Sequence, residues 1–537
     1  MSLRKHCYIF PVLLLLITSA SAQSLLPEQR TERALEATRK LGPVAVHGFL
    51  AEMPKGSDLH MHMTGSVYAE TFLKDAVVDN LCVNLTTFVL TRSIGLTKEL
   101  PVHPVCPEGQ VPAANAFKDR RLYDTLIDAF SMRNFVPVAG FSGHDQFFSV
   151  FDRFNALDRV HKGEWLDEIA TRAAAQNEQY LEIMHTPAQV VPNALRLAAD
   201  IPWPDAPVTT GDFNQDTTGT TTAQLVRLHE QVLDKGFREA IDSARKEYAD
   251  ALTARNRIEH CGQPDAVPAC LVQIRFLYQI LRGGEPMFVY AQTLAAFELA
   301  STDPDVVGIN FVQPEDCSYC MADYTRQMKM LDYLHSLYPK VHISLHAGEL
   351  APGLVPPEGL RFHIRQAIEL GHAERIGHGV DVGYEDHSAQ LLKEMAAKHV
   401  MVEVNLTSND VILGVSGKQH PLGLYRKAHV PVSLSTDDEG VSRIDLTHEY
   451  VRALEEYGLT YPELKQMVRT GMEHVFFPGA SLWATPDEFT VVAKPCAGLV
   501  LGADRPTADC RVYLEANPKA AQQWELERRF KVFEAKF

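Results

Sequence analysis

The stretch of sequence that decides the fold is Ser57-Asp58-Leu59-His60-Met61-His62-Met63. Apolar and polar residues alternate through most of it, which is the pattern of a β-strand. Residues two apart on a strand point to the same face, so His60 and His62 project side by side. Two imidazoles on one strand face make half of a metal site, because neutral imidazole nitrogen suits zinc and similar ions. A histidine pair that binds no ion is the alternative, so other segments must supply the remaining ligands.

The size and charge of the chain exclude some classes of function. Its 537 residues suit either several domains or one α/β barrel that carries insertions. The hydrophobic fraction of 46% and the charged fraction of 22% are typical of a globular protein. The formal net charge of −17 argues against nucleic acid as a partner, because such binding depends on clusters of Lys and Arg. A single nucleoside is compatible with this charge.

The first 22 residues have the features of a secretory signal peptide. Arg4 and Lys5 form a basic start, residues 8–17 are apolar, and Ala20-Ser21-Ala22 is a suitable cleavage site. The apolar run is too short to cross a bilayer comfortably, which disfavours a membrane anchor. We therefore expect a secreted or periplasmic protein that has no membrane association after cleavage.

The cysteines agree with export. Eight remain beyond the signal peptide, and an even number in an exported chain suggests disulfides. Pairing of nearest neighbours is the simplest arrangement, although the sequence leaves the connectivity open. The pairs would be 82–106, 261–270, 317–320 and 496–510.

Strand patterns alternate with helical patterns along most of the chain. A helical lead-in is expected at 23–52, and residues 75–120, which contain Cys82 and Cys106, are expected to form a disulfide-closed insertion. Strands are predicted at 55–63, 179–184, 286–290, 306–311, 342–346, 375–378, 400–405 and 430–435, and helices at 121–178 (in large part), 222–252, 361–370, 387–398 and 446–457. Eight strands alternating with helices predict a parallel (β/α)₈ barrel over residues 53–480. Residues 481–537 form a C-terminal extension with a charged helix near 520–535.

Titratable residues stand at the ends of several predicted strands. His346-Ala347-Gly348-Glu349, Gly377-His378-Gly379 and Thr436-Asp437-Asp438 follow three of them, in addition to His60 and His62. Functional groups of such barrels gather at the carboxyl ends of the strands. We therefore expect these side chains to converge on one cation.

This set of motifs resembles the adenosine deaminase family of metal-dependent amidohydrolases. The matching segments are Met53–His62, His346–Glu349, Arg375–Gly379, Glu403–Asn409 and Ser433–Asp438. The Met53-Pro54-Lys55-Gly56 lead-in, the signal peptide and the insertion are most similar to the secreted, growth-factor-related branch of the family. Each motif alone is weak, whereas the set in this order is specific.

The resemblance implies roles for particular residues. His60, His62, His346 and Asp437 would bind one Zn²⁺, and His378 would take or orient the proton of a water. Glu349 would donate a proton to purine N1, Asp438 would hydrogen-bond N7, and Glu403 would orient His378. The implied reaction converts adenosine, and also 2′-deoxyadenosine, to inosine and ammonia. The implied partner is a small purine nucleoside, and the sequence leaves monomer and homodimer open.

Simpler structural roles exist for the same residues. His378 could fill a turn, Glu349 could interact with a helix dipole, and Asp437-Asp438 could cap a helix. Glu403 could belong to a buried salt bridge rather than orient a histidine. His342, His363, His372 and His420 lie in no motif, and we expect them to be surface or packing residues.

Two positions depart from the family pattern. The family usually has an acid that meets the ribose 5′-hydroxyl where this chain has Thr64, and a glycine near the purine where it has Gln313. Both changes concern substrate fit, so another purine, such as adenine or a modified adenosine, is an alternative substrate. A third alternative is an extracellular binding or signalling protein that uses the barrel as a scaffold.

The Cys317-x-x-Cys320 segment follows this loop and is expected to form a local disulfide. A redox-active pair or half of a metal site is the alternative. The chain has no second CxxC for a zinc ribbon. It also has no suitably placed H-x-E, which disfavours the fold of the polynucleotide deaminases.

Overall fold

The computed structural model describes residues 26–94, 104–157, 159–204 and 220–537. The predicted signal peptide and the prediction for residues 23–25 lie outside these ranges. The same holds for parts of the predicted insertion and of the Pro- and Thr-rich segment after residue 201.

Eight parallel strands form the centre of the molecule, and each pairs with the next strand of the barrel along the chain. They are β1 (Gly56–His62), β5 (Glu178–His185), β6 (Gln273–Leu281), β7 (Val306–Val312), β8 (His342–Ala347), β9 (Arg375–His378), β10 (Met401–Val404) and β11 (Val432–Leu434). A parallel bridge between Met61 and Asp437 brings β1 against the chain that follows β11, so the barrel is nearly closed. The predicted (β/α)₈ TIM-type barrel is confirmed.

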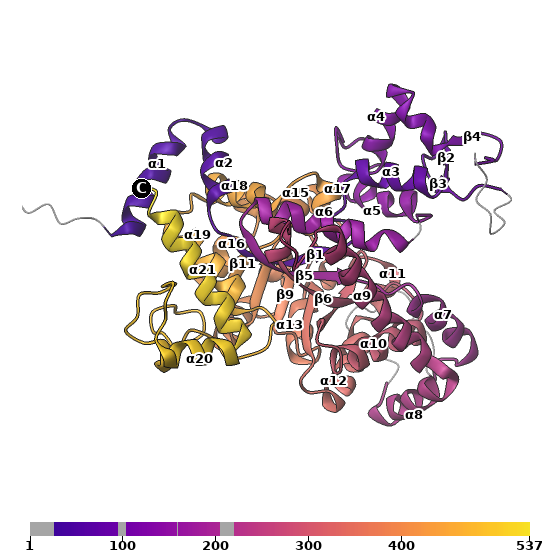
Figure 1. The fold of residues 1–537 in the computed structure, drawn as a ribbon. Coiled ribbons are helices and arrows are strands. Elements are labelled where there is room, and N and C mark those ends of the chain that lie inside the picture. Colours follow the sequence, from indigo (N-terminus) through magenta and orange to yellow (C-terminus); the bar gives the residue numbers. More distant parts are fainter. Residues whose placement is uncertain (1–25, 95–103, 158, 205–219) are drawn as a thin grey trace, which may run out of the picture.

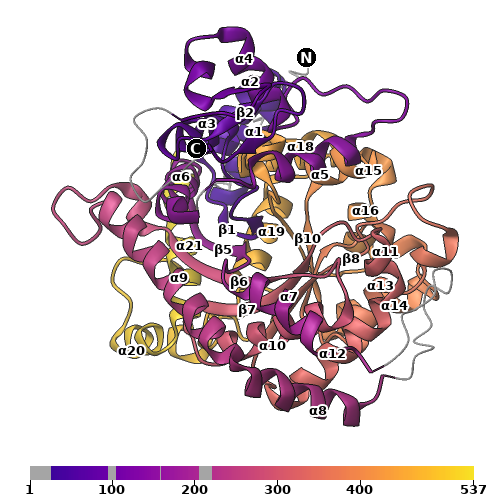
Figure 2. The same cartoon turned by 90° about the vertical axis from the view of Figure 1, so that its right-hand side faces the viewer.

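Helices surround the strands on the outside, as Figure 2 shows for α9, α10, α12, α14 and α16. Those that follow β1 and β5 are α6 (Lys162–Ala175), α7 (Val190–Asp200), α8 (Thr222–Val232) and α9 (Arg238–Ile258). Those that follow β6 to β9 are α10 (Pro286–Ala300), α11 (Ser318–Ala322), α12 (Tyr324–Leu337), α13 (His363–Glu369) and α14 (Ser388–Lys398). The last are α15 (Leu406–Leu413), α16 (Leu422–Lys427), α17 (Glu439–Ser442), α18 (Leu446–Tyr457) and α19 (Tyr461–Glu473).

The strand predicted at residues 286–290 is wrong. This segment begins α10, with Pro286 in the first turn, where the missing N–H of proline costs nothing. Its apolar run misled the prediction because α10 is buried on nearly all sides, against α7, α12, β6 and β7. The true third strand is β6, and the alternation of polar and apolar residues from Gln273 to Phe276 was the signal that the prediction missed.

The helix predicted over 222–252 is two helices, α8 and α9. A turn (η3, Leu233–Phe237) separates them, and Gly236 adopts a left-handed conformation there with φ of 77°. Glycine takes this conformation at little cost, so the chain bends at this residue.

The insertion after β1 contains α3 (Ala69–Val78), α4 (Arg120–Ala129) and α5 (Gly143–Phe154). It also has a small antiparallel sheet of β2 (Cys82–Asn84), β3 (Leu90–Thr91) and β4 (Gln110–Pro112). In Figure 1 this unit lies far from α20 and α21, on the other side of the molecule. The 3₁₀ turns of the chain are η1 (Ala113–Phe117), η2 (Arg159–His161), η4 (Pro268–Leu271), η5 (Pro357–Leu360), η6 (Val380–Gly383), η7 (Gly417–Gln419) and η8 (Lys494–Cys496).

All four nearest-neighbour disulfides are present: Cys82–Cys106, Cys261–Cys270, Cys317–Cys320 and Cys496–Cys510. The last one lies in a separate small apolar cluster of the C-terminal extension. The extension ends in α20 (Ala508–Ala516) and α21 (Pro518–Glu534).

The N-terminal segment forms α1 (Pro27–Arg39) and α2 (Pro43–Glu52), and α1 packs against α19 and α21 near the end of the chain. Across the described part of the chain, every helix is too short or too polar to traverse a bilayer.

Candidate metal centre and active site

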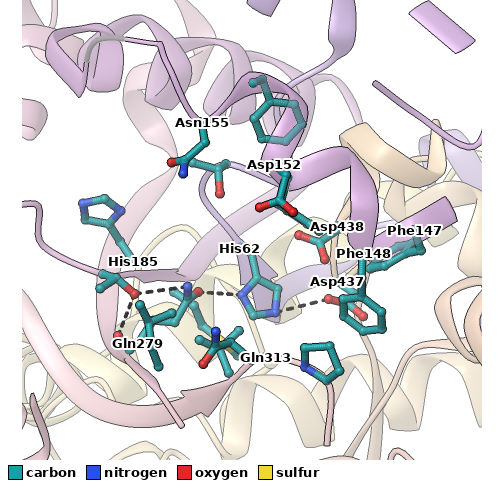
Figure 3. A pocket seen from close by; sticks show the side chains of 18 of the residues that line it. His62, Phe147, Phe148, Asp152, Asn155, His185, Gln279, Gln313, Asp437 and Asp438 are labelled. Atoms are coloured by element: carbon teal, nitrogen blue, oxygen red, sulfur yellow. Dashed lines mark hydrogen bonds and ion pairs between the residues drawn. The ribbon is translucent and has the colours of Figure 1, made fainter. Parts of the chain in front are cut away.

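A cavity of about 550 Å³ opens at the carboxyl ends of the barrel strands. His62, His346, Glu349, Asp437 and Asp438 line it together. Figure 3 shows the rings and carboxyl groups of His62, Asp437 and Asp438 gathered on one side of this cavity. The sequence prediction that these distant segments converge therefore agrees with the structure.

The four predicted metal ligands lie close together and almost without solvent contact. His60 Nε2 lies 3.1 Å from His346 Nε2. The Asp437 Oδ1 atom lies 3.3 Å from His62 Nε2 and 3.9 Å from His60 Nε2. None of the four residues is more than 5% exposed.

Each of the three histidines has its other ring nitrogen held by an acceptor from a strand. His60 Nδ1 lies 2.6 Å from a Glu403 carboxylate oxygen. His346 Nδ1 and His62 Nδ1 lie 2.8 Å and 2.7 Å from the amide oxygens of Asn310 and Gln279. A carboxylate or amide oxygen can only accept, so the proton of each ring is on Nδ1 and the lone pair is on Nε2.

The donor set therefore fits a divalent cation. Two groups of possible ligands share Asp437: one is His60, His346, His378 and Asp437, and the other is His62, Asp437 and Asp438. The nitrogen lone pairs of His60, His62 and His346 lie beside the Asp437 carboxylate, and Asp437 Oδ1 has no hydrogen-bond partner among the described residues. Such a buried cluster of acceptors is unfavourable unless a cation neutralises it. Imidazole and carboxylate ligands are those that zinc uses in catalytic sites.

The predicted partner of Glu403 is wrong. Glu403 contacts His60, Ser344 Oγ and Arg375 rather than His378. Strand β10 follows β9 in the barrel, and the Glu403 side chain points inward to the first strand's histidine across the barrel interior. Glu403 is also in a buried salt bridge with Arg375, so the simpler alternative holds as well.

Two glycines make room for this packing. A Cβ atom on Gly377 would lie 2.5 Å from the His60 ring, and one on Gly65 would lie 1.4 Å from Asp438 Oδ1. Both approaches are closer than atoms tolerate, so any side chain at these positions would displace the site. The absence of a side chain at Gly377, beside His378, thus makes room for the His60 ring.

His378 differs from the other histidines in the position of its proton. The Leu422 N–H donates to His420 Nδ1 at 3.1 Å, so His420 carries its proton on Nε2, which lies 3.0 Å from Asn409 Oδ1. The Asn409 amide group then donates to His378 Nδ1 at 3.0 Å. His378 Nε2 therefore bears the proton and points to the cluster, 3.8 Å from Asp437 Oδ2.

His420 was expected to be a surface or packing residue, but it is buried and belongs to this relay. Burial, with a contribution from the charge of Arg452, lowers the pKa of His420 to about 4, which keeps its ring neutral near pH 7. Asn405 makes a second, longer contact of 3.3 Å with His378 Nδ1.

Glu349 is buried beside the cluster, 3.6 Å from His378 Nδ1. Burial first, and then the charges of Asp437 and Glu315, raise the pKa of the Glu349 carboxyl group well above its usual range. Its Oε1 atom has no hydrogen-bond partner among the described residues. The raised pKa favours the protonated form of Glu349, which could donate its proton to a group that enters the cavity.

The predicted substrate-binding residues also line the cavity. Burial is the main cause that raises the pKa of Asp438 to about 8; the charge of His62 opposes it and that of Asp437 adds to it. A protonated Asp438 can donate a hydrogen bond to an acceptor such as a ring nitrogen. Thr64 also lines the cavity, and its side chain carries no charge.

Gln313 adopts a backbone conformation that favours glycine, with φ of 90°. Its side-chain oxygen accepts a hydrogen bond of 2.7 Å from the Gly283 N–H. The amide oxygen is therefore already used within the protein, and the loop keeps the shape that a glycine would give it.

Sequence analysis missed several residues of the site, namely Gln279, Arg282, Asn310, Glu315, His363, Asn409 and His420 as supports of the others. Gln279 and Arg282 were hidden because the third strand was misplaced. Once β6 is known, their places at its carboxyl end give the signal. Glu315 and His363 had no local signal, because their interaction joins the loop after β7 to the start of α13, 48 residues away.

A search against protein families matches residues 146–482, more than half of the chain, to the model described as adenosine deaminase. The chain is 38% identical to adenosine deaminases of Shewanella loihica and Escherichia coli over 135 and 136 residues. These alignments cover 25% of this chain and 38% of each relative, so the chain matches well under half the length of these relatives.

Among solved structures, the barrel resembles an amidohydrolase of Burkholderia ambifaria crystallised with bound Zn. The two are 16% identical, the alignment covers 91% of this chain and 95% of the other, and the TM-score is 0.51. At this identity the likeness concerns the fold alone. The family match over the barrel and the motifs within it support one conclusion: the chain belongs to the adenosine deaminase family.

Proposed function

We propose that this protein is a zinc-dependent adenosine deaminase, which converts adenosine, and also 2′-deoxyadenosine, with water to inosine and ammonia. The observation that carries this proposal is one cavity that combines a buried cluster of cation ligands with a buried carboxyl group whose pKa is raised. The ligands are His60, His62, His346 and Asp437, and the carboxyl group is that of Glu349.

The residues of the cavity suit each part of this reaction. A zinc ion would supply Lewis acidity, which lowers the pKa of water toward neutrality. The Nε2–H of His378 would orient the attacking oxygen, while Glu349 would give its proton to purine N1 and make C6 more electrophilic. Protonated Asp438 would donate to N7 and fix the ring.

The walls of the cavity favour a neutral nucleoside over a nucleotide. Asp152, Glu349, Asp437 and Asp438 line it, and Lys162 is the only Lys or Arg among the described lining residues. Lys162 is already ion-paired with Glu247 at 3.2 Å. A 5′-phosphate would therefore find Asp152 in the cavity and no unpaired Lys or Arg among the described lining residues to neutralise it.

Helix α5 supplies an apolar wall that suits a planar base. Phe147, Phe148, Phe151 and Phe154 from this helix line the cavity. Figure 3 shows Phe147 and Phe148 on the side of the cavity where Asp437 and Asp438 lie. Asp152, on the same helix, lies on the side of His62 and Asp438, where its carboxylate could accept a hydrogen bond from a ribose hydroxyl.

We also propose that the protein is exported and belongs to the secreted, growth-factor-related branch. Four disulfides among the described residues support this, because such bonds persist in oxidising compartments.

An ultraviolet assay of purine conversion tests the function. Adenosine, 2′-deoxyadenosine, adenine and adenosine 5′-monophosphate are each incubated with the purified protein, with and without a chelator, and ammonia is measured in parallel. We expect adenosine conversion that the chelator abolishes and that added zinc restores, and a kcat/KM at least about tenfold lower for the monophosphate. Preference for adenine or the monophosphate would contradict the substrate, and no turnover by zinc-loaded protein would favour a binding function.

A further inference from the structure

We propose that Glu315 is a positioning residue that sets the place of Glu349 in the cavity, acting together with Arg282 and His363. The inference rests on the proposed function, because it assigns Glu315 an effect on the proton donor of that reaction. No sequence motif pointed to Glu315, and His363 was expected to be a surface or packing residue.

The Glu315 carboxylate holds the backbone on which Glu349 stands. Its Oε1 accepts a hydrogen bond from the Gly348 N–H at 3.0 Å, and its Oε2 accepts one from the Glu349 N–H at 2.8 Å. Both oxygens are needed, because each N–H points to a different one. Glu315 is only 1% exposed, so water cannot replace either acceptor.

Two buried side chains make this carboxylate stable in its charged form. His363 Nδ1 donates to Oε1, and an Arg282 guanidinium nitrogen lies 3.9 Å from Oε2. Burial raises the pKa of Glu315, but His363, Arg282 and the Gly348 N–H outweigh it and lower the pKa to about 2. Glu315 is therefore ionised at neutral pH and can accept with both oxygens.

Arg282 connects the same network to the metal centre and to the loop that carries Glu315. Its Nη1 donates to the His346 carbonyl at 3.1 Å, and its Nε and Nη2 donate to the Gln313 carbonyl at 3.4 Å and 3.3 Å. The loop after β7 and the segment after β8 are thus fixed to one another from both sides.

The backbone turn just before Glu349 requires a glycine. Gly348 has φ of 77°, and a Cβ atom there would lie 2.4 Å from Asp381 Oδ1 and 2.8 Å from Ile364. Glu349 Oε1, in contrast, has no hydrogen-bond partner among the described residues, so its position depends on its backbone. Removing an acceptor from Glu315 should therefore move the proton donor without touching the metal ligands.

The variant Glu315→Gln tests this inference. The amide keeps the shape of the side chain but puts an NH₂ group against a backbone N–H. Because misplacement of a reacting group by about 1 Å can cost about 100-fold in rate, we expect kcat for adenosine to fall about 10- to 100-fold. KM should stay within about threefold, and zinc should stay at one ion per chain.

Glu385→Gln is the matched control. Glu385 is also buried, and it accepts from the Ile364 and Arg365 N–H groups at 2.6 Å and 3.3 Å, in the same region but not from Glu349. Its kcat should be within about threefold of the wild type. A second variant, His363→Phe, keeps the ring that stacks on Tyr324 at 3.9 Å but removes the donor to Glu315. Its kcat should fall about fivefold, the effect of one hydrogen bond.

Three results would overturn the inference. The first is an equal kcat for Glu315→Gln and Glu385→Gln, and the second is loss of zinc from Glu315→Gln. The third applies if Glu315→Gln does not fold, and it is a kcat of His363→Phe equal to that of the wild type. If the wild type itself releases no ammonia, the proposed function fails first. An active wild type with an equally active Glu315→Gln variant refutes the positioning role alone.

Discussion

Replacement of Glu349 by glutamine should leave the fold and the metal intact and remove most of the activity. Glu349 is 7% exposed, and glutamine has nearly its volume, so the packing is preserved. The Oε1 atom of Glu349 has no hydrogen-bond partner to lose among the described residues. The Glu315 contacts are to the backbone of residues 348 and 349, so the substitution keeps them as well.

The two expected magnitudes differ widely. Burial and the charges of Asp437 and Glu315 favour the neutral acid, so a neutral amide should change the free energy of unfolding by less than about 1 kcal/mol. A positioned general acid contributes about 10²- to 10⁴-fold to rate, so kcat should fall by that factor, equal to about 3–5 kcal/mol in the barrier.

Three measurements compare wild type with Glu349→Gln. Steady-state conversion of adenosine gives kcat, metal analysis gives the zinc content, and thermal melting gives the change in stability. Turnover within about tenfold of the wild type would refute the assignment of Glu349 as proton donor. Loss of zinc would show instead that Glu349 supports the metal centre.

Three further predictions concern other parts of the molecule. Asn409→Asp places an acceptor against His378 Nδ1 and should shift the ring proton to that nitrogen, lowering kcat by about 100-fold or more with zinc retained; kinetics with metal analysis checks this. Burial raises the pKa of Glu247, but its partners outweigh this and lower it to about 2, below the unfolded value near 4.5. Ionised Glu247 thus contributes up to about 3 kcal/mol to the free energy of unfolding above about pH 4.5, and this contribution is lost as the pH falls from about 4.5 to 2. In acid unfolding, Glu247→Gln should lack this pH-dependent loss of stability. Replacing Cys496 and Cys510 by Ser opens a loop of 14 residues and should cost about 3 kcal/mol in denaturant unfolding, with unchanged adenosine turnover because their cluster is separate from the cavity.

Local patterns carried most of the fold prediction. The alternation in Ser57–Met63 and the apolar strands that follow residue 300 are short-range signals, and the structure has strands at each of these places. The apolar run that starts at Pro286 was ambiguous, because a helix buried on all sides and a buried strand have the same composition. The alternation of polar and apolar residues from Gln273 to Phe276 marks the preceding segment as the strand, which leaves the run from Pro286 as the helix.

Site residues that belong to a sequence motif could be predicted. Residues that hydrogen-bond to them from distant parts of the chain could not. His60, His346 and Asp437 converge as expected, because they stand at strand ends. The contacts of His420 with Asn409 and of His363 with Glu315 join a loop to a helix through side chains, and no period or spacing in the sequence encodes them. For the same reason the partner of Glu403 could be identified only from the structure.

Zinc content per chain tests the central claim most directly, namely that segments far apart in sequence hold one ion at the mouth of the barrel. The wild type should contain one zinc per chain, and His346→Ala and Asp437→Ala should contain almost none. His342→Ala is the matched control, since His342 begins the same strand and pairs with Glu374 at its opposite end. This control should keep its zinc. A full equivalent of zinc in both His346→Ala and Asp437→Ala would contradict the account.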